Sequence, residues 1–152
     1  MALRDIVMDP DPILRKKCRE VVYFDQKLHK LLDDMKETMN NANGVGLAGP
    51  QVGILRRLAV VEVDDFYVEL INPKIIEASG EQLGLEGCLS VDEEHCKVLR
   101  PMKVKVQYFD RNGIEQTVEA TGLSARACCH EIDHLDGILY YDNLYVEENK
   151  EE

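Results

Sequence analysis

Two histidines four positions apart, His130 and His134, stand in the stretch HEIDH at residues 130–134. On a helix, residues four apart lie on the same face, so both imidazoles can point at one transition-metal ion. Glu131 lies about 100° around the helix from His130, where it could act as a base on a water molecule in the site. The alternative is a pair of core histidines that hydrogen-bond to backbone carbonyls.

A catalytic metal site also needs a third protein ligand and one open position. The chain has five cysteines, an odd number that includes the adjacent pair Cys128 and Cys129, so a disulfide framework is not expected. This usage favours a reducing, cytoplasmic compartment. A helix turns the adjacent pair away from the histidine face, and we interpret both thiols as small buried packing residues.

Cys88 has a different setting, because two closely spaced glycines, Gly84 and Gly87, precede it. There the backbone can bend and bring a thiolate close to another element. By spacing alone, Cys88 is only modestly preferred over Cys18 or Cys96 as the third ligand.

The composition is that of a globular protein, with 152 residues, of which 45% are hydrophobic and 31% charged. This length fits a single domain over residues 1–152 with one core. The net charge of −11, from 29 acidic and 18 basic residues, argues against direct binding to nucleic acid or to anionic membranes. We find no secretory signal and no apolar run of membrane-spanning length, which also favours the cytoplasm.

The elements that must position these residues form an α+β pattern. Helical spacing of leucines and methionines predicts an amphipathic N-terminal helix over 26–41, and a second helix is expected over 123–135, ended by Gly137. Strands are expected at 58–63, 67–71, 96–98 and 104–108, with a hairpin turning at Asn112-Gly113. We therefore predict antiparallel or mixed β-sheets packed around the helix that carries HEIDH, and a flexible acidic tail at about 145–152.

Three segments stand in order along the chain: GVGLAGPQVG at 44–53, EGCLS at 86–90 and HEIDHLDG at 130–137. In order and spacing they resemble the three motifs of peptide deformylase, the family that removes the N-formyl group from the initiating methionine of new polypeptides. The resemblance extends over about residues 7–144. It implies a metal-dependent hydrolase that releases formate, acting as a monomer on N-formylated nascent polypeptides near the ribosome.

The resemblance also implies residue roles. The implied metal ligands are Cys88, His130 and His134, with the fourth position left to water. Glu131 is the implied general acid and base. Gln51, through its side-chain amide, and Leu89, through its backbone N–H, are similar to the groups that hold the oxyanion.

Substrate and metal follow from the same resemblance. The implied substrate-binding residues are Gly44, Val45, Gly46, Gly87, Leu123 and Arg126. The glycines at 44 and 46 would let an extended peptide approach, and Val45, Leu123 and the stem of Arg126 would line a pocket for methionine. Members of the family use ferrous iron, which zinc, nickel or cobalt can replace. A thiolate and two imidazoles accept all four metals and disfavour magnesium or calcium.

Three positions depart from the family's usual motifs: Gly49 stands where alanine is usual, Asp92 replaces proline, and Cys129 replaces glutamine. Gly49 could loosen the loop that holds Gln51, and Cys129 could alter hydrogen bonds around the metal ligands. These departures leave open a deformylase-like protein that binds without turnover. A zinc endopeptidase of the broader HExxH type is a third hypothesis, disfavoured by the upstream cysteine.

Overall fold

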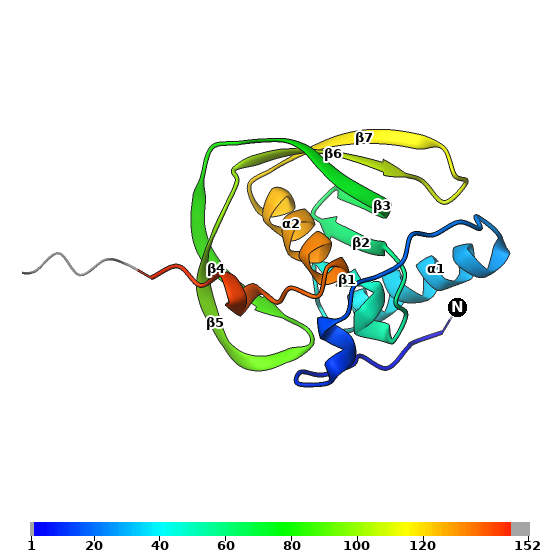
Figure 1. Ribbon diagram of the computed structural model, residues 1–152, viewed down its shortest axis with the longest axis horizontal. Coiled ribbons are helices and arrows are strands. Elements are labelled where there is room, and N and C mark those ends of the chain that lie inside the picture. Colours follow the sequence, from blue (N-terminus) through cyan, green and yellow to red (C-terminus); the bar gives the residue numbers. More distant parts are fainter. Residues whose placement is uncertain (1, 147–152) are drawn as a thin grey trace, which may run out of the picture.

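The computed structural model describes residues 2–146, apart from the side chains of Glu93 and Glu94. Its strands form a five-stranded sheet in the order β1-β2-β3-β6-β7 and a separate β4–β5 pair (Figure 1). The strands are β1 (Gly46–Ala48), β2 (Leu58–Val63), β3 (Phe66–Ser79), β4 (Gln82–Cys88), β5 (Val91–Arg100), β6 (Lys103–Phe109) and β7 (Glu115–Thr121). The helices are α1 (Gln26–Asn41) and α2 (Leu123–Leu135), with short 3-10 helices η1 (Pro12–Arg15), η2 (Gly49–Val52) and η3 (Tyr140–Asn143). Each pairing between these strands is antiparallel, which confirms the predicted α+β class.

Helix α1 covers one face of the five-stranded sheet. It begins at the cap residue Asp25, whose carboxylate accepts a hydrogen bond from the Leu28 backbone N–H at 3.1 Å. Its buried side chains recur at helical spacing and pack on Leu58, Val60 and Ile71 of β2 and β3. The buried apolar residues of α1 are Leu28, Leu31, Leu32, Met35 and Met39.

Helix α2 lies on the opposite face of the same sheet. Its Cys128 and Ile132 pack in a cluster with Val61 of β2. Because side chains alternate along a strand, Leu58 and Val60 face α1 while Val61 faces α2. The first four residues of β2 are therefore buried on both faces, which explains the unbroken apolar run LAVV.

The β4–β5 pair packs on α2 as well, so α2 lies between the two sheets in Figure 1. Strand β4 is missing from the strands predicted from the sequence, because it has two glycines and only two alternating leucines, Leu83 and Leu85. Strand β3 runs past the predicted end at Ile71. It passes Asn72, which has a positive φ of 50°, and Pro73 through a register shift, and this interruption hides the continuation from the sequence pattern.

The segment before α1 packs against the C-terminal end of α2. The Cys18 N–H donates to the Leu135 carbonyl at 2.9 Å, and Arg15 pairs with Asp142, 127 positions away. Gly137 ends the helical region with a φ of 76° and lies against the Arg15 backbone, where a Cβ would overlap. Residues near the two ends of the chain are thus joined.

Beyond η3, Leu144 forms a bridge with Val98, and the Tyr145 N–H donates to the Lys97 carbonyl at 2.9 Å. The flexible tail predicted at 145–152 begins at this contact, and its residues 147–152 lie outside the described part of the chain. Among the described residues, no helix combines the length and apolar character that crossing a membrane requires.

Shortening Leu32 to alanine should lower the free energy of unfolding by about 2–5 kcal/mol, because this side chain is fully buried between α1 and the sheet. Urea denaturation followed by circular dichroism measures the loss. Lys27→Ala, on the exposed side of the same helix, is the control and should change stability by less than about 0.5 kcal/mol. Equal effects of the two variants would contradict the packing described for α1.

Candidate metal centre and active site

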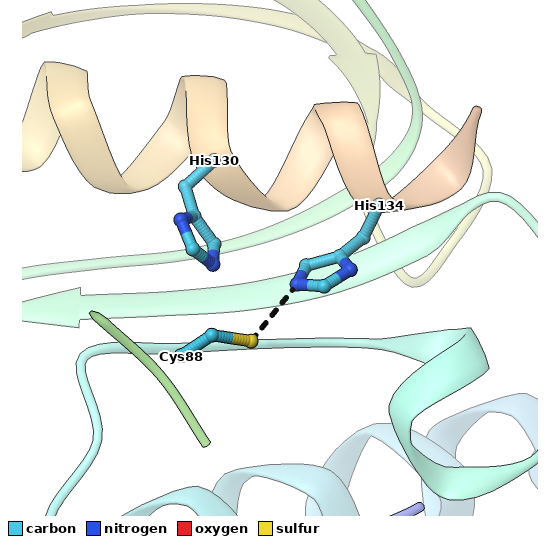
Figure 2. Close-up of side chains that lie close together, drawn as sticks. All are labelled: Cys88, His130 and His134. Carbon is cyan, nitrogen blue, oxygen red and sulfur yellow. Dashed lines mark hydrogen bonds between the residues drawn. The ribbon is translucent and has the colours of Figure 1, made fainter. Parts of the chain in front are cut away.

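Three side chains from two elements meet at one point. Cys88 stands at the end of β4, and His130 and His134 extend from α2; their candidate ligand atoms lie within 4.8 Å of one another. Figure 2 shows both rings leaving the same side of α2 toward Cys88, whose Sγ is 3.3 Å from Nε2 of His134. Two ligands of one tetrahedral ion lie about 3.6 Å apart at ordinary bond lengths. A group of one thiol and two imidazoles at this spacing could hold a transition-metal ion.

The two histidines differ in their surroundings. Burial lowers the pKa of His134 well below its usual value, so its ring is neutral and keeps a lone pair for a metal. At His130 burial also acts to lower the pKa, but the charge of Glu131 and contacts with Cys88 and Glu86 raise it to about 10. The surroundings of the His130 ring therefore favour a positive charge, and a divalent cation bound there could supply this charge in place of a proton.

A buried carboxylate fixes the orientation of His130. The Nδ1 of His130 is 2.9 Å from Oε1 of Glu86. The other ring nitrogen, Nε2, is thereby directed toward Cys88. Burial alone would raise the pKa of Glu86, but hydrogen bonds from Arg100 and His130 hold it at about 2. Glu86 is thus ionised, and His130 donates to it through Nδ1.

Two arginines hold Glu86 in turn. Arg100 donates to both carboxylate oxygens at 2.7 and 2.9 Å, and Arg126 donates to Oε2 at 2.7 Å. Arg100 also donates to Asp133 of α2 at 2.8 Å. Neither Glu86 nor Arg100 is among the site residues predicted from the sequence, although Glu86 stands two positions before Cys88 within the EGCLS motif.

Glu131 lies beside the ligand group, with Oε2 4.0 Å from Nε2 of His130. Its Oε1 is buried and has no hydrogen-bond partner in the part of the chain that the structure describes. Burial raises the pKa of Glu131 to about 7. A carboxyl group that titrates near neutral pH and keeps an oxygen free is suited to general acid–base chemistry.

Gln51 is fixed from both ends of its amide. Its Oε1 accepts from the Ala48 N–H at 2.9 Å, and its Nε2 donates to Oγ of Ser90 at 3.0 Å and lies 3.5 Å from Sγ of Cys88. The amide N–H group is therefore held next to the ligand group. The side chain is buried, and it is the one that the family resemblance implies as an oxyanion donor.

A cavity of about 350 Å³ opens beside this group. Its wall includes Cys88, His130, Glu131 and Leu89 but not Gln51 or His134. All six residues predicted to bind substrate also line it: Gly44, Val45, Gly46, Gly87, Leu123 and Arg126. The remaining lining residues are absent from the sequence predictions: Asn43, Leu85, Glu86, Val91, His95 and Ala127.

The three unusual motif positions lie in different surroundings. A Cβ on Gly49 would stand 2.6 Å from the Ile54 carbonyl oxygen, so the backbone is closely packed here and glycine lets the chain approach this carbonyl. Cys129 is buried in the cluster between α2 and the large sheet, and burial raises its pKa to about 11. Asp92 is exposed at the start of β5.

Residues 3–150 match the family model described as Polypeptide deformylase. The chain belongs to the peptide deformylase family. Members of this family are enzymes that remove the formyl group from N-formylated nascent peptides, so the family predicted from the three motifs is confirmed.

Individual relatives agree with this assignment. A peptide deformylase of Caldicellulosiruptor bescii is 54% identical over 144 residues, covering 95% of this chain and 87% of the relative. One of Acetivibrio thermocellus is 51% identical over 154 residues, covering 100% and 91%. The crystal structure of peptide deformylase from Thermotoga maritima superposes with a TM-score of 0.92 at 39% identity, over 95% of this chain and 99% of that one. The Thermotoga maritima enzyme therefore shares the α+β fold described above.

Replacing Gly46 with alanine should lower deformylase activity by about 100-fold, because the new Cβ would overlap the Glu131 carboxylate and displace the proposed acid–base group. Formate release from a formyl-Met tripeptide measures the effect. Circular dichroism and thermal melting should show that the variant stays folded. Full activity in the folded variant would contradict the close contact between Gly46 and Glu131.

Proposed function

We propose that this chain is a metal-dependent hydrolase that removes the formyl group from N-formylmethionyl polypeptides and releases formate. The observation that carries the proposal is the meeting of Cys88, His130 and His134 beside Glu131 at the wall of one cavity. Membership of the deformylase family supports the reaction, and the chemistry of the three donors supports the metal. α2 then serves as the HExxH helix of the site, and the amphipathic α1 supports the sheet behind it.

Cys88, His130 and His134 are the proposed ligands of one divalent transition-metal ion. When bound, the ion would lower the pKa of a water ligand and polarise the formyl oxygen. A soft thiolate with two imidazoles suits iron, zinc, nickel or cobalt and disfavours magnesium or calcium. Ferrous iron is the metal that we expect from the family resemblance.

The protein groups around the ligands have separate proposed tasks. Glu131 takes a proton from the attacking water as its oxygen bonds to the formyl carbon, and gives that proton to the departing amine nitrogen when the C–N bond breaks. The products are formate and a peptide with a free amino group. Gln51, through its amide N–H, and Leu89, through its backbone N–H, hold the negative charge that develops on the formyl oxygen.

The substrate peptide is proposed to lie along the cavity in an extended form. Strand β1 is at the edge of the five-stranded sheet, and β4 belongs to a two-stranded pair, so both have backbone groups available for a peptide. Gly44, Gly46 and Gly87 allow its backbone to come close. Val45, Leu123 and the stem of Arg126 form the apolar wall for the methionine side chain.

The remaining features of the proposal concern the setting of the enzyme. Residues 1–152 form a single domain that acts as a monomer in the cytoplasm, on polypeptides that emerge from the ribosome. Its net charge of −11 disfavours direct contact with nucleic acid or with anionic membranes.

Glu131→Ala should reduce formate release from a formyl-Met tripeptide by at least about 100-fold, because the proton carrier is lost. The variant should still bind one metal ion per chain, since the three ligands remain. Glu119→Ala, at an exposed position of β7, is the control and should keep full activity. Iron-loaded wild-type protein that releases no formate would refute the proposed reaction, and cleavage of unformylated peptides would favour an endopeptidase.

Removing the metal with a chelator should lower the melting temperature, because an ion that binds only the folded state stabilises it by mass action. Differential scanning calorimetry on metal-loaded and metal-free protein, with the metal content measured in each, gives the shift. Adding one equivalent of cobalt or zinc should restore the higher melting temperature. An unchanged transition despite proven metal loss would count against a site formed by the folded protein.

A further inference from the structure

Arg126 is a buried cation on α2 that lines the cavity and contacts the two-stranded sheet of β4 and β5. Its side chain is 7% exposed and extends from the first half of α2. The guanidinium Nη1 donates to Oε2 of Glu86 at 2.7 Å and to the Val98 carbonyl at 3.0 Å, and Nη2 donates to the Gln82 carbonyl at 3.2 Å. One side chain therefore connects α2 with both β4 and β5.

The backbone of β4 is shaped to accept this guanidinium. A Cβ on Gly84 would stand 3.1 Å from Nη2 of Arg126, a contact tighter than side chains usually tolerate. Glycine thus lets β4 approach the arginine, and the Gly84 carbonyl lies 3.5 Å from Nη1. A planar fork with several donors fits such a set of acceptors, whereas a lysine ammonium is a single point charge.

The ligand group depends on how β4 is placed relative to α2, because Cys88 comes from β4 and both imidazoles come from α2. In the described residues these elements share no backbone ladder, and side-chain hydrogen bonds join them. They include Arg126 to β4 and β5, Arg100 to Asp133, Gln82 to the Gly122 carbonyl, and His130 to Glu86, beside the contact between Cys88 and His134. Arg126 and Arg100 both act on Glu86, the carboxylate that orients His130.

We propose that Arg126 is a positioning residue for the metal site: its guanidinium sets the spacing between β4 and α2 and holds Glu86 against His130. This inference rests on the proposed metal site. Arg126 acts through Glu86 and the β4 and β5 backbone, and among the described residues its hydrogen bonds go to none of the three ligand side chains. The same side chain also lines the cavity. Arg126 therefore contributes both to the proposed substrate-binding wall and to the positions of the proposed metal ligands.

The experiment compares Arg126→Ala and Arg126→Lys with wild type, each loaded with cobalt as a spectroscopic probe. Cobalt affinity is measured by competition with a chelator, and the thiolate-to-cobalt absorption band reports whether Cys88 remains a ligand. We expect Arg126→Ala to weaken cobalt binding by about 10-fold, the lower end of the range for groups that support metal ligands. Arg126→Lys should bind cobalt more tightly than Arg126→Ala but more weakly than wild type. A lysine can pair with Glu86, but it cannot donate to the backbone carbonyls at the same time.

Free guanidinium offers a second measurement. Because Arg126 lines the cavity, the space left in Arg126→Ala is open to a small cation from solution. Millimolar guanidinium chloride should restore cobalt affinity and the absorption band in this variant, and equal sodium chloride should not. The control is Arg111→Ala, which removes an arginine paired with Glu69 and Asp33 outside the cavity and should leave both signals unchanged.

The outcomes separate this inference from the proposed function. Wild-type protein that binds no cobalt and releases no formate would overturn the proposed function itself. Active wild type, with Arg126→Ala that melts at a lower temperature but keeps its cobalt affinity and spectrum, would reduce Arg126 to a stabilising contact and overturn the inference. If Arg126→Ala does not fold, a cobalt affinity and spectrum in Arg126→Lys identical to wild type would overturn it as well.

Discussion

One buried carboxylate, Glu86, sits between two arginines and a histidine and joins the smaller sheet to the central helix. Taking a carboxylate out of water costs several kcal/mol, and the cost is recovered only when good hydrogen bonds surround it. Here both oxygens are used, by Arg100, Arg126 and His130. Removing one partner from such a buried ionic group lowers the free energy of unfolding by about 3–5 kcal/mol. Substitutions of Arg100, Arg126 or His130 are therefore poorly tolerated. These contacts help to place β4 against α2, and Cys88 of β4 meets the two imidazoles of α2 there.

Glycines allow the remaining elements to come close enough. Gly46 lies against the Glu131 carboxylate, and Gly84 lies against the Arg126 guanidinium. In both places a methyl group would occupy the space that a charged side chain now fills. At these two positions the bare glycine backbone faces a charged side chain, which makes the site compact. The cavity beside the site is left for a ligand.

Local patterns in the sequence predict some parts of this structure and miss others. The helices at Gln26–Asn41 and Leu123–Leu135 and the spacing of HEIDH follow from periodicity, which is a local property. Choosing Cys88 over the other cysteines needed the family resemblance, because the spacing of the cysteines gives Cys88 only a modest preference. Glu86 and Arg126 are 40 positions apart, and their pairing leaves no trace in either segment. The close packing at Gly49 depends on carbonyls of Ile54 and Arg56 that only the folded chain brings near.

The pairing of the N-terminal segment with the end of α2 bears on how the protein is made. Cys18 bonds to Leu135 and Arg15 pairs with Asp142, so these two contacts cannot form until residues 135 and 142 have been synthesised and have left the exit tunnel. Contacts between such distant positions form slowly, because a long loop must close before they are gained. The thiolate and the imidazoles likewise belong to segments that are translated far apart in time. Cotranslational folding can therefore complete the sheet around β2 and β3 early, while assembly of the site waits for a single late step.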